Sequence, residues 1–152
     1  MNYLRKLSLI LGVLAVALSS TVSSVQADAG SQYQILQAVN SIRQQHRLPP
    51  LQIHPSLQKA AKEQARLMAR TGKMAHKVGR GHGFSARLRR VGYRGLAAEN
   101  IAKGQETLSH VLGAWLKSPG HRRNMLHPRM RYFGLAANRK DGRNYWAMVL
   151  GG

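Results

Sequence analysis

Three side chains that are far apart in the sequence, His76, Glu99 and His121, have the residue types of a metal or acid–base site. Glu99 lies in an otherwise uncharged stretch, so its carboxylate would need a partner if the stretch is buried. Both histidines follow the expected end of a helix, where loops often place functional side chains. Two imidazoles and one carboxylate form the ligand set of an open zinc site with water in the fourth position. Their spacing matches no local metal motif, so a metal site is one interpretation among several.

The remaining ionisable residues give weaker signals. The four other acids have ordinary surface explanations: Asp28, Glu63, Glu106 and Asp141. Three histidines on or beside expected helices are more typical of solvated side chains: His46, His54 and His110. His82 lies in a glycine-rich loop and could join the site, and His127 precedes a proline, where it could shape a turn. Ser109 and Ser118 are hydroxyl nucleophiles in principle, but nothing in their spacing places either beside His121.

The chain is strongly basic, with 24 Lys and Arg against 5 Asp and Glu and a formal net charge of +19. Without Arg5 and Lys6, residues 28–152 keep 22 basic and 5 acidic residues, or +17. Such a charge attracts polyanions, among them nucleic acid, anionic lipid and acidic cell-envelope polymers. A surface that is basic for general reasons, with no specific partner, is an equally open interpretation.

The first 27 residues have the pattern of a secretory signal peptide. Two basic residues precede an apolar run over residues 7–18, and Val25-Gln26-Ala27 ends with the small residue that a signal peptidase prefers. The run is shorter than the roughly 18–20 residues needed to span a bilayer, which favours cleavage after Ala27 over a permanent anchor. We therefore expect a secreted or periplasmic protein with no transmembrane segment in its mature chain. Because cysteine is absent, disulfides and a cysteine-linked lipid anchor are excluded.

Residues 28–152 are enough for a single domain with a hydrophobic core. Apolar spacing predicts a helix over 33–46, a second that opens at Pro55 and ends near Gly72, and a short one over 84–91. Thr107 is expected to cap a further helix, which Ser118-Pro119-Gly120 ends. Asp141-Gly142 separates two apolar runs and predicts a terminal hairpin. Helices followed by a hairpin indicate an α+β fold with helices packed on a sheet.

Ordered segments along residues 33–152 resemble the CAP superfamily, the group of cysteine-rich secretory, antigen 5 and pathogenesis-related proteins. They are "QAVNSIRQQHRLPPLQIHPSLQKAAKEQARLMA", His76 in "KMAH", "AENIAKG", "WLKSPGHRRNMLHPRMRYFGLA" and "YWAMVLG". The chain is most similar to the cysteine-free, SCP-like bacterial branch. This resemblance implies an α-β-α sandwich, in which a small antiparallel sheet lies between helical layers and a cleft opens on one side.

The resemblance also implies a site in that cleft. In the family, two histidines and one or two glutamates converge, and the matching positions are His76, Glu99 and His121. We expect them to form a cleft triad that serves as catalytic groups or as ligands of a divalent metal, zinc or magnesium. Supporting hydrogen bonds are expected from Asn100 and Asn124, with Ser118 nearby, and Ser118-Pro119-Gly120 is expected to end the helix so that His121 faces the cleft before the next strand. The second glutamate of many relatives is missing, which reduces the charge available to a metal.

Three functions follow in order of preference. The first is an exported binding module for an anionic or amphipathic ligand, such as a lipid, an envelope glycan or a host molecule. The second is a metal-dependent, protease-like hydrolase that uses His76, Glu99 and His121 to activate water. The third is a nuclease or nucleic-acid binder built around His121 and Asn124, which the expected signal peptide and the absence of a basic–aromatic platform disfavour.

Overall fold

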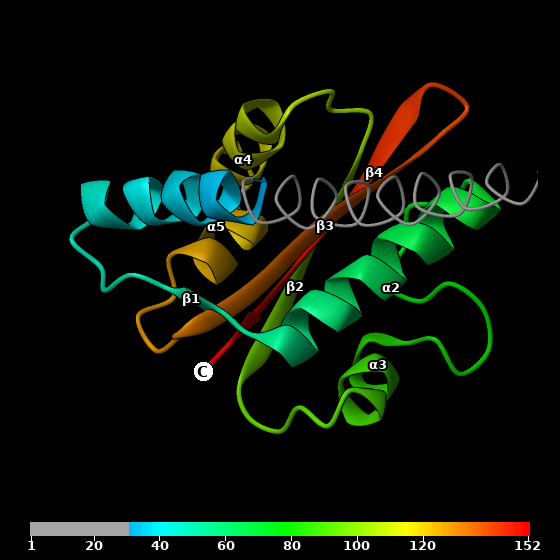
Figure 1. The fold of residues 1–152 in the computed structure, drawn as a ribbon, viewed down its shortest axis with the longest axis horizontal. Coiled ribbons are helices and arrows are strands. Elements are labelled where there is room, and N and C mark those ends of the chain that lie inside the picture. Colours follow the sequence, from blue (N-terminus) through cyan, green and yellow to red (C-terminus); the bar gives the residue numbers. More distant parts are fainter. Residues whose placement is uncertain (1–30) are drawn as a thin grey trace, which may run out of the picture. The chain divides into compact units, whose positions relative to one another are not determined.

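A computed structural model describes residues 31–152, of which Ile35–Gly152 form one compact unit (Figure 1). The expected signal peptide and its cleavage after Ala27 lie outside the described residues. Helical backbone runs over 31–45, and the labelled elements follow in the order β1 Gln52–Ile53, α2 Pro55–Thr71, α3 Phe84–Arg90, β2 Ala97–Lys103, α4 Leu108–Lys117, α5 Pro119–Met125, β3 Tyr132–Lys140 and β4 Arg143–Gly151. The expected helices and the terminal hairpin are confirmed.

The four strands form one sheet in the order β1-β3-β4-β2. β4 pairs with β3 and β2 in antiparallel fashion, whereas the two residues of β1 pair with β3 in parallel. The sheet is therefore antiparallel, as expected, apart from this two-residue edge strand.

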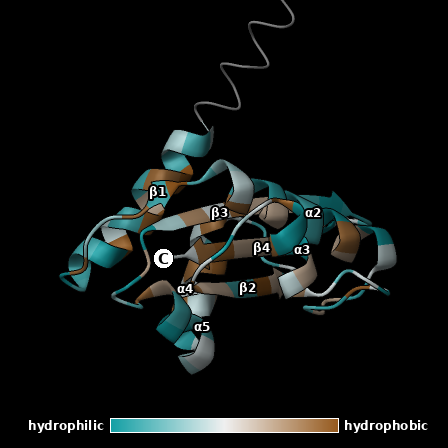
Figure 2. Cartoon of the chain, turned by 90° about the horizontal axis from the view of Figure 1, so that it is seen from below, coloured by the Kyte–Doolittle hydropathy of each residue, from teal (hydrophilic) through white to brown (hydrophobic). Residues whose placement is uncertain are grey.

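Helices cover both faces of the sheet, which confirms the α-β-α sandwich. Because side chains alternate along a strand, Met148 and Leu150 of β4 face one layer, and Ala147 and Val149 face the other. The first layer contains the helix over 35–45, α4 and α5, and the second contains α2 and α3. In Figure 2 the central strands carry much of the hydrophobic colour, whereas the helices are largely hydrophilic on their outer sides.

Helix α2 starts and ends at the residues that the sequence indicates. Pro55 occupies its first turn, and Nδ1 of His54 accepts a hydrogen bond from the Ser56 backbone N–H at 3.2 Å. Gly72 ends the helix in the left-handed region, at φ 70°. The helix packs so closely on β3 that a Cβ atom on Gly134 would lie 2.3 Å from the backbone nitrogen of Gln58. Gly134 permits this approach, because any side chain there would collide with the helix backbone.

The hairpin turn has the local geometry that Asp-Gly favours. Asp141 and Gly142 both have positive φ angles, 48° and 72°, as a two-residue hairpin loop requires. The turn sets the register of β3 against β4, in which Lys140 pairs with Arg143 and Phe133 pairs with Leu150.

The structure corrects the interpretation of Ser118-Pro119-Gly120. Ser118 is at once the C-cap of α4 and the N-cap of α5, and Pro119 is the first residue of α5. Proline stops the preceding helix but is well suited to the first turn of the next one. His121 therefore lies inside a short helix, and no strand begins there.

Among residues 31–152, no helix combines the length and the apolar character needed to cross a bilayer.

Candidate functional site

His76 and Glu99 are in direct contact. Glu99 comes from the edge strand β2 and its side chain is only 2% exposed, whereas His76 comes from the loop after α2 and its side chain is 57% exposed. Nδ1 of His76 lies 2.8 Å from Oε1 of Glu99. Because a carboxylate only accepts hydrogen bonds, Nδ1 carries the proton. Nε2 is then the free nitrogen of the neutral ring.

Arg87 of α3 contacts the second oxygen of Glu99. Its guanidinium is completely buried and donates a short hydrogen bond from Nη2 to Glu99 Oε2. Nη1 donates to the backbone carbonyls of His76 at 3.1 Å and His82 at 2.6 Å. One buried cation thus binds both the acid and two points of the loop that carries His76. The arrangement fixes the orientation of His76 relative to β2.

The sequence contains a signal for Arg87 outside its motifs. In the helix α3 and its C-cap, Phe84, Leu88 and Val91 follow the spacing of an apolar stripe and pack against the core. Arg87 falls on that same stripe, where a charged residue must be paired. A lone arginine on an apolar face, together with a lone acid in an apolar strand, would have predicted this ion pair.

His121 lies close enough to His76 for the two rings to interact electrostatically. Burial lowers the pKa of the half-buried His121, and repulsion from the neighbouring His76 ring, when that ring is protonated, lowers it further. Within the described part of the chain, the His121 ring makes no hydrogen bond or ion pair. Its free nitrogens are therefore available to a ligand.

The two expected supporting amides form a chain beside Glu99. Nδ2 of Asn100 donates to the backbone carbonyl of His121 at 3.0 Å, and Nδ2 of Asn124 donates to Oδ1 of Asn100 at 2.9 Å. Asn100 is fully buried, as its neighbour Glu99 nearly is. This chain links β2 to α5 and fixes the backbone of His121 next to the strand that supplies Glu99.

Three other predicted residues have structural roles here. The backbone carbonyl of Ser118 accepts from Arg122 N–H at 2.8 Å, and its hydroxyl makes no capping bond. Nδ1 of His82 lies 3.4 Å from Oε1 of Glu63, so it belongs to a separate surface cluster. Nδ1 of His127 accepts from the Arg129 backbone N–H at 3.2 Å, which shapes the turn before β3.

The donor set does not fit the expected three-ligand metal site in this arrangement. Both oxygens of Glu99 are occupied, one by His76 and the other by Arg87. The proton on Nδ1 of His76 also directs that nitrogen to the carboxylate. In the part of the chain that the structure describes, no three His, Asp or Glu side chains are grouped so that they could hold a metal ion.

The sandwich fold agrees with the family that matches the chain. Residues 36–150 match the family model of CAP, the cysteine-rich secretory protein family, and the chain belongs to that family. The match confirms the resemblance drawn from the sequence motifs. It begins within the first described helix and ends within β4.

Among curated proteins, the chain is similar to the uncharacterized protein YkwD of Bacillus subtilis, with 31% identity over 120 residues. That alignment covers 77% of this chain but 46% of YkwD, so the chain spans about half the length of this relative.

Solved structures give the same result for the fold. An extracellular SCP-domain protein of Bacillus anthracis has 28% identity and a TM-score of 0.69, over 78% of this chain and 39% of that one. An outer surface protein of Borrelia burgdorferi has 24% identity and a TM-score of 0.70, over 79% of this chain and 90% of that one.

Proposed function

We propose that this CAP domain is an exported binding module for an anionic or amphipathic ligand. The observation that carries the proposal is that few of the basic side chains have an acidic partner. In the described residues only Glu63 and Glu99 form ion pairs, and their cationic partners are Arg87, Arg90, His76 and His82. Most Lys and Arg side chains in this part of the chain therefore have no acidic partner. A surface with so many unpaired cations attracts anions over a long range.

The His76–Glu99–His121 face supplies donors within this field. Glu99 is shielded by Arg87, so the acid presents little negative charge to an incoming anion. His76 is exposed, and the His121 ring has free nitrogens. A ligand with phosphate or carboxylate groups could accept hydrogen bonds from both rings once they are protonated. Location outside the cytoplasm agrees with the expected signal peptide and with the extracellular description of the similar B. anthracis protein.

The test is co-sedimentation of residues 28–152 with lipid vesicles. We expect the domain to pellet with phosphatidylglycerol vesicles at low salt, to remain in solution with phosphatidylcholine vesicles, and to dissociate as salt is added. An anionic envelope glycan can replace the vesicles in a second series. A domain that stays in solution with every anionic probe at low salt would contradict the proposal.

One observation supports hydrolysis as a second candidate. The contact with Glu99 orients His76 and leaves Nε2 as the free nitrogen, which is the arrangement of a histidine general base. The measurement is release of a chromophore from ester and peptide substrates, with and without added zinc. Activity lost in His76→Ala would support this candidate, and wild-type protein at the uncatalysed rate under both conditions would exclude it for those substrates.

A further inference from the structure

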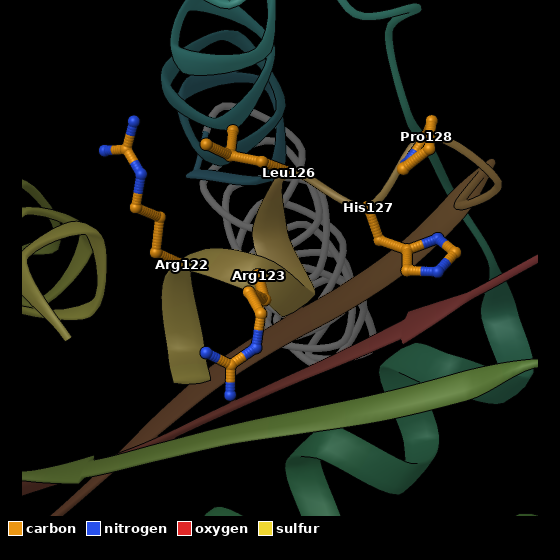
Figure 3. A pocket seen from close by; sticks show the side chains of 5 residues that line it. All are labelled: Arg122, Arg123, Leu126, His127 and Pro128. Atoms are coloured by element: carbon orange, nitrogen blue, oxygen red, sulfur yellow. The ribbon is translucent and has the colours of Figure 1, made fainter. Parts of the chain in front are cut away.

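A second candidate site lies at the C-terminal half of α5, where a pocket of about 360 Å³ opens beside the turn that leads to β3. Its lining combines cationic, aromatic and apolar side chains: Arg122, Arg123, Leu126, His127 and Pro128. In Figure 3 the two arginines lie on one side and His127 and Pro128 on the other, with Leu126 between them. The volume falls near the lower end of the roughly 300–1,000 Å³ typical of small-molecule sites.

The polar groups of this pocket are donors. Nδ1 of His46 lies 2.8 Å from the carbonyl of Ile42, so Nδ1 carries the proton and Nε2 accepts from Nη2 of Arg122 at 3.0 Å. This contact positions the Arg122 side chain and leaves its other N–H groups free. In His127, Nδ1 accepts from a backbone N–H, so the proton of the neutral ring is on Nε2. Arg122, Arg123 and His127 thus bring hydrogen-bond donors to a lining that also contains Leu126 and Pro128, and Figure 3 shows the two guanidinium groups pointing in different directions.

No acid among the described residues neutralises these cations, because the ion pairs formed there by Glu63 and Glu99 involve other partners. A further cation, Arg43, is 1% exposed and lies behind the pocket backbone. Its Nη1 donates to the carbonyls of Met125 at 2.8 Å and His127 at 3.3 Å. Arg43 thus holds the pocket wall in place and adds positive charge next to it.

We propose that this pocket binds a phosphate group that carries an apolar substituent, that is, an alkyl phosphate. Guanidinium groups bind phosphate through paired hydrogen bonds. Arg122 and Arg123 are exposed, so both side chains have room to turn toward a doubly charged phosphate at the pocket. The apolar surface of Leu126 and Pro128 contacts the first carbons of the substituent. The inference deepens the proposed function and rests on it, because it names a ligand class and a pocket for anion binding.

The direct test is a titration of residues 28–152 with hexyl phosphate, followed by amide NMR shifts and by calorimetry. We expect the shift changes to cluster at residues 122–128 and hexyl phosphate to bind more tightly than inorganic phosphate. Arg122→Gln/Arg123→Gln should weaken binding at least about tenfold, because it removes charge-assisted hydrogen bonds. Arg123→Gln alone should give an intermediate loss.

The control variant is Arg139→Gln/Arg143→Gln, which makes the same change in net charge on exposed residues beside the hairpin turn. It should change binding less than about twofold if the pocket acts through contacts and not through the overall field. Equal losses in the two double variants, shift changes centred on His76 and His121, or equal affinity for inorganic and hexyl phosphate would overturn the proposal. Thermal unfolding of each variant checks that the fold is intact.

Vesicles distinguish the source of the ligand and separate this inference from the proposed function. If the Arg122→Gln/Arg123→Gln variant binds neither hexyl phosphate nor phosphatidic acid vesicles, the ligand is a lipid headgroup. If the variant no longer binds hexyl phosphate but still binds the vesicles, the ligand is a soluble alkyl phosphate. If the wild-type domain binds anionic vesicles but not hexyl phosphate, the pocket proposal is contradicted and the broader function is not. Wild-type domain that binds hexyl phosphate but no anionic vesicle or glycan contradicts the broader surface-binding function.

Discussion

Arg87 and Arg43 are both buried guanidinium groups, but they lie in opposite helical layers and bond to different partners. Arg87 pairs with the buried carboxylate of Glu99 and also donates to two carbonyls. Arg43 has no acid among the described residues; it donates to the backbone carbonyls of Pro49, Met125, His127 and Met130. Burial lowers the pKa of Arg43, and repulsion from Arg131 lowers it further.

The difference separates two uses of a buried cation. At Arg87 the charge is cancelled locally, and the ion pair orients His76 through the shared carboxylate. At Arg43 the carbonyl dipoles satisfy the hydrogen bonds but leave the full positive charge in place. That charge lies behind the α5 pocket, where the lining arginines also lack an acid among the residues that the structure describes. One layer of the fold therefore holds a neutralised network, and the other holds a field that favours anions.

The largest expected effect is from Glu99→Ala. It removes the partner of a fully buried cation, and breaking a buried pair in this way costs about 3–5 kcal/mol of unfolding free energy. Urea denaturation measures the loss. A double-mutant cycle with Arg87→Met should show strong coupling, since each single change leaves the other charge unpaired. Additive effects of the two changes would contradict the role assigned to Arg87.

Arg43→Met should be less harmful, by about 1–3 kcal/mol, because it leaves backbone carbonyls without donors but no charge unpaired. The same denaturation series compares it directly with Glu99→Ala. Amide exchange should increase over residues 125–130, because Arg43 holds the carbonyls of Met125, His127 and Met130. A loss of unfolding free energy as large as that of Glu99→Ala would contradict the distinction between a cation paired with an acid and one bound by carbonyls.

Glu63→Ala provides the exposed counterpart. Glu63 Oε1 lies 2.5 Å from Arg90 Nη2 and 3.4 Å from His82 Nδ1, but these side chains are partly exposed. Water screens such pairs, so we expect a change in unfolding free energy of at most about 1 kcal/mol. A larger loss would show that the surface cluster also anchors the 77–83 loop.

The smallest expected effect is the pH dependence contributed by His121. Its folded-state pKa is below the ordinary value of 6.5, so the unfolded chain binds the proton more readily. This contribution to stability is present above pH 6.5 and is lost as the pH falls from there through the folded pKa. NMR titration of the His121 ring measures the shift. His76→Ala should restore part of it, because the remaining cause is burial; complete restoration would contradict that order of causes.

Local signals in the sequence predicted most of the helices and the hairpin. Pro55 and Gly72 bound α2, and Asp141-Gly142 forms a turn, because the preferences of these residues act within a few positions. Strand β2 was not predicted. Its sequence, "AAENIAK", lacks the β-branched alternation of a typical strand. It becomes a strand because all seven of its residues pair with β4, from Ala97 opposite Gly151 to Lys103 opposite Tyr145.

The candidate site also combines residues that the sequence indicates with a contact that only the fold provides. Sequence motifs and family resemblance selected His76, Glu99 and His121, and the need of a buried carboxylate for a partner was evident from the apolar stretch around Glu99. The partner that we overlooked, Arg87, lies on the apolar stripe of α3. The sequence left open whether Glu99 is an acid–base group or a metal ligand, and the fold brings a buried guanidinium to its second oxygen.

By itself, the sequence determined where helices stop, where the hairpin turns and that positive charge greatly exceeds negative charge. These properties depend on residue type and on neighbours close along the chain. Only the tertiary structure decided which cations are neutralised. The ion pair between Arg87 and Glu99 requires contact between α3 and β2. Arg122 and Arg123, in contrast, line a pocket that contains no acid. Charge is a property of composition, but its compensation depends on distances between segments that only folding brings together.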